Sequence, residues 1–123
     1  MPHDFEPIFV RLGAILRRHS GALSVKEDSP DCFCLALKRH PHPRLKGPMP
    51  VAWVQIGKAY VSYHLMSVYG CPKLLDGVSK KLKARMQGKS CFNFKAVDEA
   101  LFTELEDLTM RGFAAFRKAG FGP

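Results

Sequence analysis

The sequence contains no long apolar run, and its longest uninterrupted apolar stretches are only a few residues. A helix that spans a bilayer needs roughly 20 predominantly apolar residues, so we expect no membrane-spanning segment. The first residues, MPHDFEPIFV, also have no basic region ahead of an apolar block. We therefore expect no secretory signal and a cytoplasmic location.

Catalytic signatures are missing as well. The sequence has no Gly-rich phosphate loop, no nucleophile elbow and no His-Glu metal motif. It has no internal repeat, no low-complexity segment and no linker long enough to divide it, and its 123 residues with 46% apolar content suit one core. We interpret residues 1–123 as a single domain that binds rather than catalyses, and the sequence identifies no cofactor.

Acidic residues are scarce, with 11 Asp and Glu against 19 Lys and Arg, which gives a net charge of +8. The excess is uneven. Residues 38–46, KRHPHPRLK, contain no acid, residues 73–89 contain only one, and residues 98–107 reverse the sign. A positive field of this kind attracts nucleic acid, acidic proteins or anionic metabolites, and it does not determine the fold.

Periodicity predicts an α+β fold. Apolar residues at one-face helical spacing predict helices over residues 5–19 and 73–86, and a third that starts at the N-cap Asp98. Alternating patterns predict strands over residues 22–26, 32–38, 50–56, 59–66 and 91–95. The strands over residues 50–56 and 59–66 form a predicted hairpin, and the order of the elements is α-β-β-β-β-α-β-α. We expect a largely antiparallel sheet with the helices packed on one face.

The hairpin determines which side chains share a face. Gly57 and Lys58 fit a two-residue type II′ turn, which predicts that Val54 lies opposite Val61 and Trp53 opposite Ser62. Val54 and Val61 would then face the core. The second face would carry two aromatic rings, an imidazole, a hydroxyl and an amide, provided that no bulge interrupts the period of two.

This second face is the first candidate site. It combines apolar walls with a few polar groups, as small-molecule sites do, and its net positive surroundings suit an anionic ligand. A homodimer contact is the alternative, and scattered surface aromatic residues are the third interpretation. The predicted ligand-binding residues are Trp53, Gln55, Tyr60, Ser62, His64, Asn93 and Lys95.

A metal site is the second candidate. Cys32 and Cys34 lie two residues apart on a predicted strand and point the same way, and Cys91 and His64 fall on the same predicted face. Zinc sites, however, usually show Cys-x₂₋₄-Cys loops, which are absent here. Without an export signal we expect reduced thiols, and free cysteine is commonly a small buried apolar residue. The pair of histidines in HPHP, residues 40–43, is a second and weaker chelating group.

The basic segment 73–89 is the third candidate, as an anion or nucleic-acid site. Its apolar residues fall on one side of the predicted helix and its cations on the other, which is also typical of the solvated face of a packed helix. Together with the loop 38–46 it favours phosphate contacts, and Trp53 and Tyr60 would stack bases from the same side. The cations are Lys73, Lys80, Lys81, Lys83, Arg85 and Lys89.

Four segments, VAWVQIGKAYVSYHLM, LLDGVSKKLKAR, GKSCFNF and DEALFTELEDL, carry a resemblance over about residues 30 to 110. In element order, and in the Gly88-Lys89-Ser90 entry to a strand, the chain resembles the bacterial domain-of-unknown-function 1801 family. The resemblance implies an α+β fold with an antiparallel sheet and, for some members, a frataxin-like iron-chaperone role. Iron carriage of that kind uses exposed carboxylates. The closing helix supplies such acids, Glu99, Glu104, Glu106 and Asp107, which also match its dipole.

Overall fold

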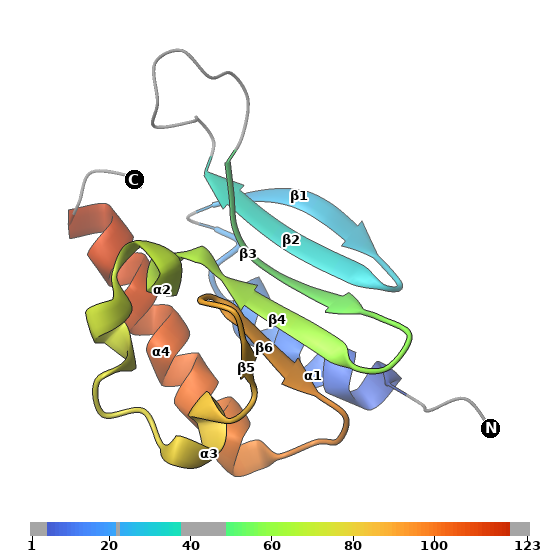
Figure 1. Cartoon of the computed structure of the whole chain (residues 1–123). Helices are drawn as coiled ribbons and strands as arrows, with labels where there is room; N and C mark the ends of the chain where they lie inside the picture. Colours follow the sequence, from blue (N-terminus) through green and yellow to red (C-terminus); the bar gives the residue numbers. More distant parts are fainter. Residues whose placement is uncertain (1–4, 22, 38–48, 119–123) are drawn as a thin grey trace.

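The computed structural model describes residues 5–21, 23–37 and 49–118. It confirms the predicted α+β fold, with a six-stranded antiparallel sheet in the order β1-β2-β3-β4-β6-β5 (Figure 1). The strands are β1 (Ser24–Ser29), β2 (Cys32–Leu37), β3 (Met49–Ile56), β4 (Val61–Leu65), β5 (Met86–Gln87) and β6 (Cys91–Phe94). The helices are α1 (Glu6–Arg17), α2 (Met66–Gly70), the 3₁₀ turn η1 (Pro72–Leu75), α3 (Lys80–Lys83) and α4 (Glu99–Lys118).

The two long helices, α1 and α4, pack on the same face of the sheet (Figure 1). Gly13 of α1 approaches Val54 of β3, and the ring of Phe94 in β6 meets that of Phe102 in α4 edge-on, with centroids 5.0 Å apart. These contacts enclose one hydrophobic core. None of the described helices is both long and apolar enough to cross a bilayer.

A buried polar contact and a close backbone approach hold the short helix α2 and the sheet to α4. The hydroxyl groups of Tyr63 and Thr109 are 2.5 Å apart inside the core. A Cβ atom at Gly112 would lie only 2.1 Å from Ser67 Oγ, so a larger residue at position 112 would force α2 away from α4. The helices therefore pack closely because residue 112 has no side chain.

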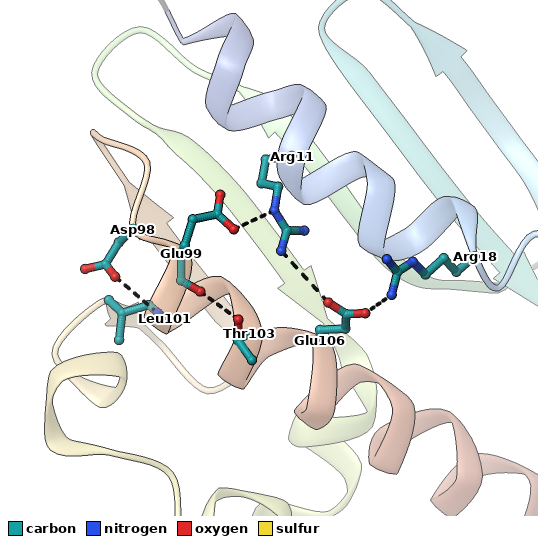
Figure 2. Close-up of polar contacts among 7 residues, drawn as sticks. All are labelled: Arg11, Arg18, Asp98, Glu99, Leu101, Thr103 and Glu106. Carbon is teal, nitrogen blue, oxygen red and sulfur yellow. Dashed lines mark hydrogen bonds and ion pairs between the residues drawn. The ribbon is translucent and has the colours of Figure 1, made fainter.

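Ion pairs along the outside join α1 to α4 (Figure 2). Arg11 lies 2.8 Å from Glu99 and 4.0 Å from Glu106, and Arg18 also pairs with Glu106. At the start of α4, the carboxylate of Asp98 accepts the backbone N–H of Leu101, which confirms the predicted N-cap. Exposed pairs of this kind each contribute only about 0–1 kcal/mol, so they orient the helices more than they stabilise them.

The predicted two-residue turn of the β3–β4 hairpin is wrong. Residues 57–60 form a longer loop in which the backbone N–H of Gly57 donates to the carbonyl of Tyr60 at 2.9 Å. Gly57 does not have the positive φ that a type II′ turn requires at that position. The pairing is consequently shifted by two residues, so that Val54 lies opposite Tyr63 and Trp53 opposite His64.

The predicted faces nevertheless hold, because a shift of two residues returns every side chain to the same side of a strand. Val54 and Val61 are buried in the core, and Trp53 and His64 are on the opposite face and only partly covered. The assignment of core and second face is therefore confirmed despite the wrong turn.

The predicted helix over residues 73–86, which was expected to carry the cations of the basic segment 73–89, is wrong as a continuous helix. It consists of η1, a break at Gly77 with φ of +85°, the single turn α3, and the short strand β5. Glu104 of α4 contacts the segment at this break, where its carboxylate accepts both the backbone N–H and the hydroxyl of Ser79, at 3.0 and 2.7 Å. Ser79 is thereby held extended, and its hydroxyl caps α3 by accepting the N–H of Leu82.

Candidate ligand-binding site

The second face of the sheet, which we call the open face, carries two rows of side chains that cross the strands. The register places Cys34, Trp53, His64 and Cys91 side by side in one row, on β2, β3, β4 and β6. The next row contains Cys32, Gln55, Ser62 and Asn93. The structure thus brings together the polar residues that the sequence analysis assigned to this face.

Two further predicted residues, Tyr60 and Lys95, lie toward the β6–β5 side of the open face. The hydroxyl of Tyr60 is 3.5 Å from the side-chain oxygen of Gln87, which also accepts from the amide of Asn93 at 2.7 Å. Lys95 directly follows Phe94, which is buried, and is exposed. It is the first residue after β6 and lies in a bend at the end of that strand.

The indole of Trp53 and the imidazole of His64 are stacked at the centre of the open face. Their ring centroids are 4.5 Å apart and their planes differ by 15°. The ring nitrogen Nε2 of His64 also lies 3.2 Å from Ser62 Oγ and 3.8 Å from Cys91 Sγ. His64 thus contacts three neighbours while it stays partly exposed, and it covers one side of the indole.

The thiol of Cys91 lies close to the imidazole of His64, but the two groups do not form a thiolate–imidazolium pair. Burial lowers the pKa of His64 and raises the pKa of Cys91, since a low-dielectric environment disfavours both charged forms. A nucleophilic cysteine needs the opposite shift, toward thiolate. At neutral pH the pair is a neutral thiol beside a neutral imidazole.

The remaining thiols of the open face are also protonated at neutral pH. Burial, reinforced by the charge of Glu27, raises the pKa of Cys32 to about 11. Burial likewise raises the pKa of Cys34. The described cysteines of this face are therefore neutral thiols rather than thiolates.

A shallow depression of about 290 Å³ lies on the open face beside Trp53. Its lining comes from β1, β2 and β3: Lys26, Glu27, Cys32, Cys34, Pro50, Trp53 and Gln55. In the register, Trp53 has Cys34 on one side and His64 on the other, and only Cys34 lines the depression. The indole is therefore one wall, and His64 supports it from behind.

Sequence reasoning missed Lys26, Glu27 and Pro50, because two bulges bring them to the depression. The β1–β2 register shifts between Val25 and Glu27, and the β2–β3 register shifts so that Ala36 pairs with Pro50. A bulge moves later residues to the other face. The sequence offered one indirect signal, Pro50 at the start of a strand, where proline is tolerated.

The metal candidates do not assemble into a site in the part of the chain that the structure describes. Within residues 5–21, 23–37 and 49–118, no group of three or more His, Cys, Asp or Glu side chains is arranged to hold a metal ion. Cys91 and His64 are neighbours, but Trp53 separates them from Cys34 in the row. The HPHP segment lies outside the described residues.

The acids of α4 that an iron-carrying surface would use already have protein partners. Glu99 pairs with Arg11 of α1, and Glu106 pairs with Arg18, the residue that follows α1. Asp107 pairs with Arg111 at 2.8 Å, and Glu104 accepts hydrogen bonds from Ser79. These carboxylates join elements of the fold. The geometry adds no support to the iron-chaperone interpretation.

The predicted cations of segment 73–89 fall into two groups, because the segment is not one helix. Lys73 lies in η1, and Lys80, Lys81 and Lys83 lie in α3, both of which contact α4 in the helical layer. Lys81 is 3.5 Å from Asp98. Arg85 and Lys89 instead flank β5 at the edge of the sheet, and the loop 38–46 lies outside the described residues.

A scan against protein-family models and searches of the curated proteins and of the solved structures found nothing that matches this chain. The resemblance to the domain-of-unknown-function 1801 family stays a prediction, and the site has to be interpreted from its own geometry.

Proposed function

We propose that the protein is a binding domain that holds a small molecule with a planar ring in the depression beside Trp53. The observation that carries the proposal is the position of the indole, which forms one wall of a depression on the open face while His64 supports its other side. A fixed aromatic wall favours a ligand ring stacked at an offset. The ligand would enter from solvent, since the depression is shallow.

Polar groups around the depression support a ligand with hydrogen-bonding substituents. Gln55 provides both a donor and acceptors, and Lys26 and Glu27 provide one charge of each sign at the rim. The two charges offset each other locally, so attraction of an anionic ligand comes from the net charge of +8 of the whole chain. The ring, rather than a charge, is the part of the ligand that this site selects.

Binding without catalysis is supported by the protonation states. The thiols of Cys32 and Cys34 at the depression have raised pKa values, as does Cys91 beside His64. Within the described residues, no group of three or more His, Cys, Asp or Glu side chains is arranged to hold a metal ion. The two cysteines that line the depression therefore provide contacts as neutral thiols.

A thermal-shift screen of ring-containing metabolites tests this proposal. A ligand at 100 times its dissociation constant adds about 2.7 kcal/mol to the free energy of unfolding, which is readily measured. The variant Gln55→Phe fills the depression from an exposed position, and Asn93→Ala is the control because Asn93 lies on the same face outside it. We expect Gln55→Phe to abolish the shift and Asn93→Ala to retain it. A shift that survives in Gln55→Phe would place the ligand elsewhere.

A second copy of the chain is the alternative occupant of the open face, because Trp53 and Tyr60 are partly exposed among polar groups. Light scattering separates the two. A dimer that Trp53→Lys dissociates would replace the small-ligand proposal, and a monomer at all concentrations would leave the depression available.

A further inference from the structure

The charges that border the open face differ between its two sides, since the β1–β2 side carries both signs, with Lys26 beside Glu27, and the β6–β5 edge carries only cations. Glu27 and Asp31 are on the β1–β2 side, where Ser29 contacts both carboxylates. Cations border the other side, at the β6–β5 edge, where Arg85 precedes β5 and Lys95 follows β6, while Lys89, in the turn between the strands, has its ammonium group 5.8 Å from the centroid of the Tyr69 ring in α2. A negatively charged chain on this face would therefore lie toward β5.

The register places Arg85 on the open-face side of this edge. The carbonyl of Arg85 accepts the backbone N–H of Asn93 at 2.8 Å, which extends the β5–β6 pairing by one residue. Met86, between Arg85 and Gln87, packs against the core. Arg85 and Gln87 consequently lie on the other side, next to Asn93 and near Tyr60.

These three cations are not neutralised within the described part of the chain. The described ion pairs use Arg11, Arg17, Arg18, Lys81 and Arg111, and none of them involves Arg85, Lys89 or Lys95. Most acids of α4 are occupied on the helical side, by Arg11, Arg18 or Ser79. Cations outside these ion pairs thus border the open face on both sides, with Lys26 beside Glu27 at the depression and the β6–β5 edge carrying cations without a neighbouring acid.

We propose that the open face binds single-stranded nucleic acid, with one unpaired base stacked on Trp53 and the phosphates directed to Arg85 and Lys95. This rests on the proposed function, because the base is the planar ring that the depression takes. Stacking on aromatic side chains, combined with a cationic groove or edge, is how open sheets hold unpaired strands. Tyr60, between Trp53 and the cationic edge, offers a second ring.

The spacing favours an oligonucleotide over a mononucleotide. Trp53 on β3 is two interstrand spacings from β6 and three from β5, which is about 10–14 Å. The base slot and the phosphate-binding edge are therefore too far apart for the base and phosphate of one nucleotide. A strand of several nucleotides spans both, and its backbone is attracted more to the β6–β5 edge, which has only cations, than to the β1–β2 side, where Glu27 and Asp31 accompany Lys26.

Fluorescence anisotropy with a labelled single-stranded oligonucleotide, as DNA and as RNA of the same sequence, tests the proposal. The double variant Arg85→Glu, Lys95→Glu reverses the edge, and Lys80→Glu, Lys83→Glu makes the same change in net charge on α3 in the helical layer. We expect the edge variant to weaken binding at least tenfold and the α3 variant to weaken it about twofold. The dependence of log affinity on log salt should also fall by about 0.7 for each phosphate that the edge variant no longer binds.

The stacking contact is tested with Trp53→Leu and Tyr60→Leu. Each should weaken binding of the oligonucleotide about tenfold with little change in the salt dependence, since stacking contributes independently of counterion release. Quenching of the fluorescence of Trp53, the one tryptophan of the chain, should accompany binding in the wild type. Circular dichroism of each variant shows whether it folds, and Arg85→Gln, Lys95→Gln replaces the edge variant if it does not.

Several outcomes would overturn the inference. Equal losses of affinity in the edge and α3 variants would mean that the overall charge attracts the strand without a site. Tighter binding of duplex than of single strand would contradict the unpaired base. If no oligonucleotide binds while ring metabolites still give a thermal shift that Gln55→Phe abolishes, the nucleic-acid inference fails and the proposed function stands. If that shift is also absent, both fail.

Discussion

The stacked pair of Trp53 and His64 allows the open face to be probed at single residues. His64 is neutral at pH 7 because burial lowers its pKa below the ordinary value of 6.5. The imidazole touches the indole, so its protonation should change the fluorescence of Trp53. We expect a fluorescence titration with a midpoint below pH 6.5 that is absent in His64→Gln.

Stability should follow the same titration. Because the pKa of His64 is lower in the folded than in the unfolded chain, the unfolded chain binds more protons between the two values. The contribution of neutral His64 is present above pH 6.5 and is lost as the pH falls through the folded pKa. Urea unfolding at pH 7 and pH 5 should therefore show a smaller loss of stability in His64→Gln than in wild type. A fluorescence midpoint above pH 6.5 would mean that attraction between imidazolium and indole outweighs burial.

At the scale of elements, the sequence predicted correctly which residues of segment 72–87 pack against the core, but it did not predict the backbone conformation of that segment. Val78 and Leu82 are buried, and Leu74, Leu75 and Met86 pack against the core, as the helical pattern implied. A periodic pattern specifies which residues face the core. A series of short turns can direct those residues to the core as well as one continuous helix can. Gly77 was a local signal for a break in the helix. The contact between Ser79 and Glu104 joins residues that are 25 positions apart, so a local sequence pattern cannot predict it.

That contact distinguishes two glutamates of the same helix. Glu104 binds the backbone and hydroxyl of Ser79 and so fixes the cap of α3, while Glu99 forms an exposed pair with Arg11. We expect Glu104→Ala to lower the free energy of unfolding by about 1–3 kcal/mol, and Glu99→Ala by less than about 1 kcal/mol. Urea unfolding measures both. Equal costs would show that Glu104 does not determine how segment 72–87 folds.

At the scale of the whole molecule, the sequence predicted the fold class and the two faces of the sheet. The error in the β3–β4 turn did not alter the faces, because the pairing moved by an even number of residues. The depression itself was beyond prediction. It depends on the bulges near Lys26 and at Pro50, which follow from how three strands fit together rather than from alternation in any one of them.

Copies of the chain could also associate by pairing their edge strands. The two edges of the sheet determine whether this happens. The edge strand β1 carries Lys26, Glu27 and Asp28 and is bulged, and the other edge strand, β5, is only two residues long. Charges, bulges and short strands are the devices that block pairing between edges. Exposed Val25 is adjacent, so removal of the charges would extend an apolar edge.

We therefore expect the double variant Lys26→Val, Glu27→Val to associate with rising concentration, while the wild type does not associate through this edge. The change removes one charge of each sign, so net charge stays at +8 and cannot account for the effect. Asp76→Val with Lys83→Val is the matched control, since it makes the same change at exposed positions outside the strands. Sedimentation velocity over a concentration series gives the comparison. Equal association of both variants would implicate added apolar surface alone, and a monomeric Lys26→Val, Glu27→Val would show that the bulge protects the edge without its charges.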